Sequence, residues 1–538
     1  MPEALLAVKN LTIAFNSDDN VVDAVSFSIY PGETFALVGE SGSGKSITAL
    51  SVLRLLPGNA RITAAAIDLN GDNLLARPEF ELCRIRGGRI GLIFQDPMSS
   101  LNPVMTIGRQ IEEVLATHFS LSKKARRQRV LELLRRVEIP EPEKRRKEYP
   151  HQLSGGQRQR VMIAMALAGE PDLLIADEPT TALDVTIQAQ ILALLKTIQQ
   201  NTGMALWLIS HDLALVSTIA DRVAVMQKGK IVETATSTAL FKNPAHPYTR
   251  KLLDALPVMA HCLHQKDESP ARPLLKVEDF KVYYPIRKGV FKRVVGHVRA
   301  VDGVSFSIAQ GKTLALVGES GCGKTTLGKA LLNLIPAHAG RVEMGGVALD
   351  SLSGEALRLK RGDIQIVFQD PFAAMNPRML VAEIIGEGIR ALHPAIDSTE
   401  RQKKIAQLLK QVDLPAESAH RYPHEFSGGQ RQRICIARAL AVEPKLIVCD
   451  EPTSALDVSV QAQIIELLKC LQREQGISYL FITHDLTLVG AIADNVAVMY
   501  QGKIVEQGLA AQVLRHPAHA YTRELLAAVP RLLVGDGE

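Results

Sequence analysis

The sequence lacks the features of a membrane-spanning or disulfide-bonded protein. No apolar run approaches the ~20 residues that a membrane helix needs, and its first residues lack the basic and apolar regions of a secretory signal. The six cysteines form no C-x-x-C pair, which favours a reducing compartment. A net charge of +5 is too small to indicate nucleic-acid binding by itself. Any link to a membrane is therefore expected to run through a partner or through the protein surface.

A glycine-rich octapeptide is present twice, at residues 39–46 and 318–325. Both copies fit G-x-x-x-x-G-K-[ST], in which glycines let the backbone N–H groups surround phosphate oxygens and the following helix adds its positive dipole end. The lysine supplies charge to the outer phosphates, and the hydroxyl holds Mg²⁺. The predicted phosphate-contacting residues are Gly39, Ser41, Gly42, Ser43, Gly44, Lys45, Ser46 and Ile47, and Gly318, Ser320, Gly321, Cys322, Gly323, Lys324, Thr325 and Thr326.

The whole chain is a tandem duplication. Matching landmarks recur at a nearly constant offset of about 275 residues, a domain-sized period that excludes stacked short repeats. We expect domains at residues 1–257 and 274–538, joined by a proline-bounded linker at 258–273. His261-Cys262-Leu263-His264 resembles part of a metal site, but no second ligand cluster completes it, so a plain linker is expected there.

Each half predicts an α/β fold. Short apolar runs that alternate with helical segments around a P-loop indicate a parallel-sheet core. The predicted elements are antiparallel strands at Val21–Tyr30 and Val301–Ile308, buried strands at Thr34–Val38, Thr313–Val317, Leu173–Ala176, Ala205–Ile209 and Val223–Met226, and a helix at Ser46–Leu56. A helical insert is expected over residues 104–150, where Val130, Leu133, Leu134 and Val137 fall on one face.

Further polar residues follow the first P-loop in a fixed order. The strand that ends in Asp177-Glu178 delivers two carboxylates to the sheet edge beside the P-loop. Asp177 is predicted to hold Mg²⁺, Glu178 to polarise the attacking water, and His211 to stabilise the γ-phosphate. Gln95 is placed to touch Mg²⁺ or the water. A helix predicted at Arg158–Ala168 provides a second anion site, and the signature motif Ser154-Gly155-Gly156-Gln157 opens this helix. The second half repeats the set as Gln369, Ser427-Gly428-Gly429-Gln430, Asp450, Glu451 and His484.

With these motifs together, the chain resembles the nucleotide-binding subunit of ATP-binding-cassette (ABC) transporters, with two cassettes fused. The resemblance covers essentially the whole chain and implies two RecA-like P-loop NTPase cores, each with an antiparallel β subdomain and a helical subdomain. It implies ATP and Mg²⁺ as cofactors, and two composite sites in which the S-G-G-Q motif of each half completes the other half's site. It also implies that Phe15 and Tyr284 stack on adenine.

Two positions invite comment within this resemblance. Phe426 stands where leucine is usual before the signature, and we expect it to adjust packing only. Cys322 lies before a helix N-terminus, so both a thiol of lowered pKa and an inert small residue are open interpretations.

The segments after each cassette, residues 243–253 and 516–526, resemble the tail of ATPases that serve bacterial oligopeptide, dipeptide and nickel importers. The fused layout and the segment 285–289 are similar to the peptide and microcin C importer ATPase. This resemblance implies two transmembrane permease subunits, an extracytoplasmic solute-binding protein and a peripheral location on the cytoplasmic side of the inner membrane. A soluble tandem-ABC ATPase acting on ribosomes or nucleic acid is the alternative, but its long charged linker is missing.

Three surface features complete the predictions. The basic runs at 123–129 and 144–147 contain interspersed glutamates and are expected to be solvated helix faces. Arg287, Lys288, Lys292 and Arg293 are expected in an exposed hairpin. The apolar residues at 98–104 and 372–379 are candidate walls of a groove for a permease coupling helix, with internal helix packing as the alternative.

Overall fold

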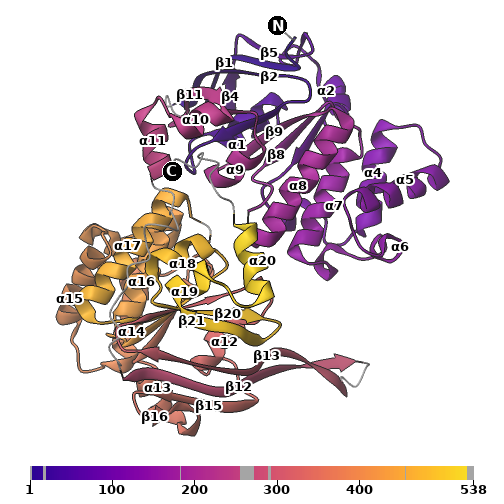
Figure 1. The fold of residues 1–538 in the computed structure, drawn as a ribbon. Helices are drawn as coiled ribbons and strands as arrows, with labels where there is room; N and C mark the ends of the chain where they lie inside the picture. The colour runs from indigo at the N-terminus through magenta and orange to yellow at the C-terminus, as the bar shows by residue number, and fades with distance from the viewer. Residues whose placement is uncertain are drawn as a thin grey trace. The chain divides into compact units, whose positions relative to one another are not determined.

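The computed structural model describes residues 3–15, 20–181, 183–254, 272–288, 293–454 and 456–529 (Figure 1). These residues form two compact units, one up to residue 254 and the other from residue 272 to 529. The predicted linker lies almost entirely outside the described residues, as does His261-Cys262-Leu263-His264.

The first unit is built on a six-stranded, mostly parallel sheet. Its strand order is β11-β10-β3-β9-β8-β7, with β11 antiparallel at one edge. The bounds are β3 Thr34–Val38, β7 Ile90–Ile93, β8 Leu173–Asp177, β9 Ala205–Ser210, β10 Arg222–Gln227 and β11 Lys230–Thr236. Every residue of β3, β8 and β9 is buried, as expected for strands covered on both faces. The continuous apolar runs therefore predicted these strands to within one residue.

A smaller antiparallel sheet packs against this core. It contains β1 (Leu6–Phe15), β2 (Asn20–Ile29), β4 (Ala60–Thr63), β5 (Ala66–Leu69) and β6 (Asp72–Asn73). Phe27 of β2 stacks on Phe35 of β3 with ring centroids 5.3 Å apart, and lies 5.0 Å from Trp207 of β9. These aromatic contacts fix the antiparallel sheet against the strand that leads into the glycine-rich loop.

The helical insert is three separate helices rather than one continuous helical stretch. They are α4 (Ile107–His118), α5 (Lys123–Arg136) and the short α6 (Pro142–Arg145). The predicted apolar face of α5 is buried, because Val130, Leu133, Leu134 and Val137 pack into the core of the unit. The breaks follow local chemistry, since Ser122 caps α5 by accepting the backbone N–H of Ala125.

Two other helix boundaries differ from prediction. The helix after the first glycine-rich loop, α1, spans Lys45–Val52 and stops four residues before the predicted end at Leu56. The signature helix α7 spans Gly155–Leu167 and begins three residues before the predicted Arg158. It starts early because Ser154 and Gln157 form a capping box that stabilises the two glycines in the first turn.

The second unit repeats this architecture. Its core sheet has the order β17-β18-β19-β14-β20-β21, and its antiparallel sheet the order β13-β12-β15-β16. The core strands are β14 Thr313–Val317, β17 Ile364–Val367, β18 Leu446–Asp450, β19 Ser478–Thr483, β20 Asn495–Tyr500 and β21 Lys503–Leu509. The main helices are α12 Lys324–Leu331, α14 Val381–Leu392, α15 Ser398–Gln411, α16 Gly428–Leu440 and α17 Val458–Gln475.

The antiparallel sheet of the second unit carries a long two-stranded ribbon (Figure 1). Its strands are β12 (Pro273–Lys288) and β13 (Arg293–Ala309), which pair out to Lys288 and Arg293. The predicted strand at Val301–Ile308 is therefore only the inner half of β13. The outer half escaped prediction because its valines face solvent. Arg293 is exposed on the expected hairpin, while Lys292 lies outside the described residues.

Each basic run of the first unit contacts carboxylates. Arg129 contacts Glu132 and Glu170, Lys144 contacts Glu141, and Arg145 contacts Glu148. This arrangement agrees with the prediction of solvated helix faces. No helix in the described part of the chain combines the length and hydropathy of a membrane span.

Replacing Trp207 with alanine tests the aromatic joint between the two sheets. The side chain is fully buried, so we expect its loss to destabilise the first unit by about 3–5 kcal/mol. Differential scanning calorimetry of the full chain should show the unfolding transition of one unit moving to lower temperature. Phe80→Ala is the control, because Phe80 is 63% exposed; an equal shift in both variants would contradict the role of the joint.

Candidate functional site

The first glycine-rich loop joins the buried strand β3 to helix α1. Gly39 has φ 155° and approaches the neighbouring strand so closely that a Cβ would lie 2.2 Å from the Met226 carbonyl oxygen. Gly44 has φ 104°, a left-handed conformation that favours glycine. Close packing and backbone conformation therefore both require glycine at the ends of this loop.

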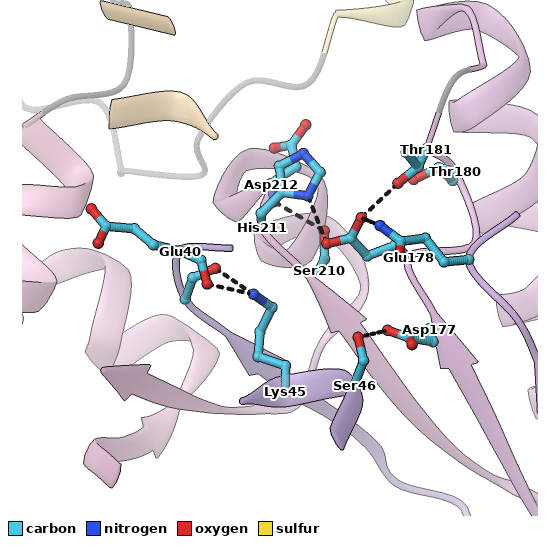
Figure 2. A network of polar contacts seen from close by, with 12 residues as sticks. Glu40, Lys45, Ser46, Asp177, Glu178, Thr180, Thr181, Ser210, His211 and Asp212 are labelled. Carbon is cyan, nitrogen blue, oxygen red and sulfur yellow. Dashed lines mark hydrogen bonds and ion pairs between the residues drawn. The ribbon is translucent and has the colours of Figure 1, made fainter. Parts of the chain in front are cut away.

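The lysine of each loop is buried and held by the loop itself. Lys45 donates to the carbonyl oxygens of Gly39 and Glu40, both at 2.8 Å (Figure 2). Lys324 donates in the same way to Gly318 at 2.6 Å and Glu319 at 2.9 Å. Both ammonium groups are thus fixed over the entrance of their loops, with positive charge concentrated where the backbone N–H groups converge.

Two of the three predicted magnesium ligands meet in each unit. Ser46 donates to Asp177 Oδ1 at 2.9 Å, and Thr325 donates to Asp450 Oδ1 at the same distance. A hydroxyl and a carboxylate oxygen are a donor set that Mg²⁺ accepts, so the residues present fit this ion. Burial raises the pKa of Asp177 to about 6 and also raises the pKa of Asp450. A cation bound there would favour the ionised form of each carboxylate.

The second carboxylate of β8 is surrounded by polar partners. Glu178 has φ 46°, and its Oε1 lies 3.0 Å from His211 Nδ1 (Figure 2). Its Oε2 accepts from Gln95 Nε2 at 2.8 Å and from Thr181 Oγ1 at 2.9 Å. Burial alone would raise the pKa of Glu178, but the His211 hydrogen bond and charge, with the Thr181 hydroxyl, outweigh it and lower the pKa to about 2. The group is therefore ionised at neutral pH.

Gln95 was predicted to touch Mg²⁺ or the attacking water, and that role stays a prediction. Its amide contacts the Glu178 carboxylate, so it joins the residue predicted to polarise water. Thr181 was not among the predicted site residues. Its position three residues after Glu178 is the only available signal, and the strand-to-helix turn converts that spacing into contact.

The second unit matches this arrangement with one difference. Glu451 Oε1 lies 3.2 Å from His484 Nδ1, and Glu451 Oε2 accepts from Gln369 at 2.9 Å. The counterpart of Thr181 is Ser454, whose hydroxyl instead donates to the backbone oxygen of Glu451 at 3.2 Å. Burial opposes the shift, yet contact with His484 lowers the pKa of Glu451 as well. Both glutamates are thus held ionised, with different hydroxyl support.

Each signature motif begins a 13-residue helix. Ser154 and Ser427 are the N-caps, and each accepts the backbone N–H of the glutamine three residues later. A Cβ on Gly156 would lie 2.9 Å from Ile187, and one on Gly429 would lie 2.5 Å from Val460. The glycines thus keep the first turn close to the following helix, which in the first unit is α8 (Val185–Thr202). Each exposed N-terminus is suited to an anion.

The two aromatic candidates occupy equivalent places in their sheets. Phe15 lies two residues beyond Ile13, which pairs with Val22, and Tyr284 lies two beyond Val282, which pairs with Val301. Phe15 packs against the core of its unit, whereas Tyr284 is 40% exposed. Adenine stacking stays a prediction for both.

Two substitutions between the halves fit their surroundings. Phe426 is 4% exposed, the same as Leu153 at the matching place, and the Arg421 guanidinium lies 4.5 Å from its ring centroid. Cys322 is buried, with its Sγ 3.8 Å from Lys324 Nζ. The remaining predicted phosphate contacts, Ser41, Gly42, Ser43, Ile47, Ser320, Gly321, Gly323 and Thr326, lie in the two loops and the first turns that follow them.

Comparisons with known proteins agree with this geometry. The family described as ABC transporter matches residues 22–181 and 301–454. The family described as oligopeptide/dipeptide transporter, C-terminal region, matches residues 232–280 and 505–537. Both families therefore match twice, once in each half.

Curated relatives align with nearly the whole chain. The peptidoglycan transport ATP-binding protein YejF of Agrobacterium fabrum (strain C58) is 51% identical over 98% of this chain and 96% of that protein. An uncharacterized ABC transporter ATP-binding protein YejF of Escherichia coli (strain K12) is 49% identical over 98% of this chain and 100% of that protein. The glutathione import ATP-binding protein GsiA of the same strain is 47% identical over 98% of this chain and 89% of that protein. The chain belongs to the ABC transporter family, as an ATP-hydrolysing subunit with two fused cassettes.

Proposed function

We propose that this chain powers the import of peptides, or of peptide-like solutes, across a bacterial inner membrane. The observation that carries the proposal is the oligopeptide/dipeptide transporter C-terminal region, which follows both cassettes. Relatives that span the chain are described as peptidoglycan transport and glutathione import proteins, and both solutes contain peptide bonds. The ribosome or nucleic-acid alternative is not favoured by these findings.

Equivalent residues would perform the chemistry in each cassette. Glu178 and Glu451 are ionised and would polarise the attacking water. His211 and His484 contact those carboxylates and would stabilise the γ-phosphate. Ser46 with Asp177, and Thr325 with Asp450, would hold Mg²⁺, which would supply charge neutralisation at the phosphates. Lys45 and Lys324 move from the loop carbonyl oxygens to the phosphates. The two composite sites implied by the family resemblance are part of this proposal.

The transport partners are two transmembrane permease subunits, with an extracytoplasmic solute-binding protein acting through them. Val104 and Phe372 support a docking role for the predicted groove walls, because they are 78% and 49% exposed. Met375 is buried and belongs to internal packing instead. The chain would work at the cytoplasmic side of the membrane, held by the permeases. No nucleic acid is required.

Changing either glutamate to glutamine tests its catalytic role. Glu178→Gln and Glu451→Gln should each lower steady-state ATP hydrolysis by at least about tenfold in the assembled complex, the low end of losing a general base. Glu170→Gln serves as control, since its side chain is 59% exposed. Wild-type turnover in either glutamate variant would show that the two sites are not equally required.

Removing the hydroxyl groups tests the magnesium assignment. Ser46→Ala and Thr325→Val each leave Asp177 or Asp450 without its hydroxyl partner. We expect the Mg²⁺ concentration for half-maximal ATP hydrolysis to rise several-fold, because one oxygen ligand is lost. Thr197→Ala, on an exposed helical position, should leave the Mg²⁺ titration unchanged. Unaltered Mg²⁺ dependence in both site variants would remove these hydroxyls from the metal site.

Uptake by cells tests the solute class. A strain that lacks this chain should fail to accumulate a labelled oligopeptide, and the wild-type copy should restore uptake while Glu178→Gln should not. Transport of an unrelated solute through another system is the control. Normal peptide uptake together with loss of a different solute would overturn the peptide assignment.

A further inference from the structure

The segment after the second cassette is clamped to the core sheet. Strand β21 supplies Glu506, whose two carboxylate oxygens accept the backbone N–H groups of Ala518 at 2.7 Å and His519 at 3.0 Å. In the first unit Glu233 accepts from Ala245 and His246 at the same distances. A turn that is repeated with equal geometry in both units is a built feature of the tail.

This clamp orients Tyr521 at the start of helix α20 (Ala520–Ala528). The Tyr521 backbone N–H donates to His519 Nδ1 at 3.2 Å, and the side chain is 7% exposed. The ring centroid lies 4.2 Å from that of Tyr500, the last residue of β20. Strand β20 runs beside β14, with Val498 paired to Val317. The tyrosine therefore packs where the two strands end, next to the start of the glycine-rich loop.

The Tyr521 hydroxyl reaches that loop directly. It accepts the backbone N–H of Glu319 at 3.1 Å. The carbonyl oxygen of the same residue accepts from Lys324 Nζ at 2.9 Å. One loop residue is thus held by the tail on its N–H side and by the phosphate-binding lysine on its carbonyl side. Any movement of the lysine toward a phosphate must change the bonding of Glu319.

We propose that Tyr521 is a positioning residue for the second nucleotide site, and that the C-terminal tail contributes to nucleotide affinity through this contact. The hydroxyl fixes the entrance of the loop, so that the following N–H groups and Lys324 face the phosphates. By linkage, nucleotide on the loop must change the stability of the tail by the same factor that the tail changes nucleotide affinity. This inference rests on the proposed role of residues 318–325 as the phosphate loop.

The test compares tyrosine variants of the full chain in a Lys45→Ala background, so that nucleotide binding reports the second cassette. Tyr521→Phe removes one hydroxyl and keeps the ring. Titration with a fluorescent ATP analogue and Mg²⁺ should show a Kd about two- to tenfold higher, the range for loss of one net hydrogen bond. Tyr500→Phe is the matched control. It removes the hydroxyl that accepts from Gln501 at 3.1 Å, next to Tyr521 but away from the loop.

A second readout separates positioning from general loosening. Hydrogen exchange of the α20 amides should slow when ATP is added to the parent protein and to Tyr500→Phe. In Tyr521→Phe this ATP-dependent protection should be lost, while the melting temperature without nucleotide stays close to that of Tyr500→Phe.

Lys324→Ala distinguishes the possible failures. Weaker binding in Lys324→Ala with unchanged Kd and unchanged tail protection in Tyr521→Phe would overturn the inference about the tail. Equal weakening in both tyrosine variants would also overturn it, because the hydroxyl contact would then have no specific effect. No effect of Lys324→Ala would overturn the proposed phosphate loop itself.

Discussion

The hydrogen bond between Ser46 and Asp177 joins positions 131 residues apart in the chain, and the catalytic arrangement depends on it. It fixes the first turn of α1, the helix that follows β3, against the carboxyl end of β8. Strand β9 lies between β3 and β8 in the sheet. Because parallel strands deliver their carboxyl ends to one edge of a sheet, this register also brings Glu178 and His211 to the same place. The equivalent bond from Thr325 to Asp450 does the same in the second unit.

The sequence was sufficient for the core strands because their burial on both faces leaves continuous apolar runs. It was also sufficient to place the loop lysines and the Asp-Glu pairs at the strand ends, because both positions follow directly from the buried strands that precede them. The partners of Glu178 were less accessible. Gln95 could be predicted as a site residue, but its contact with Glu178 could not, and Thr181 was not predicted at all. Side-chain contacts across a turn depend on the backbone conformation, which periodicity does not encode. The start of the signature helix was predicted three residues too late, because a capping box stabilises the glycines of its first turn.

Duplication has preserved the backbone frame more strictly than the side chains that line it. In both loops a buried lysine donates hydrogen bonds to two equivalent carbonyl oxygens. The residue two places before that lysine is serine in one unit and cysteine in the other, and the hydroxyl beside the glutamate bonds to a carboxylate in one unit and to a backbone oxygen in the other. The cassettes therefore share a backbone geometry but differ in the polarity of single side chains. Substitution of such side chains can change one site while the other keeps its contacts.

Trp207 is the single tryptophan of the chain and lies fully buried on β9, against the Phe27 ring of β2 and in register with Phe35 of β3. All indole emission from the intact protein consequently originates in one cassette. That emission is a native optical label, and it can follow events in the first cassette during turnover while the second stays spectroscopically silent at the same wavelength.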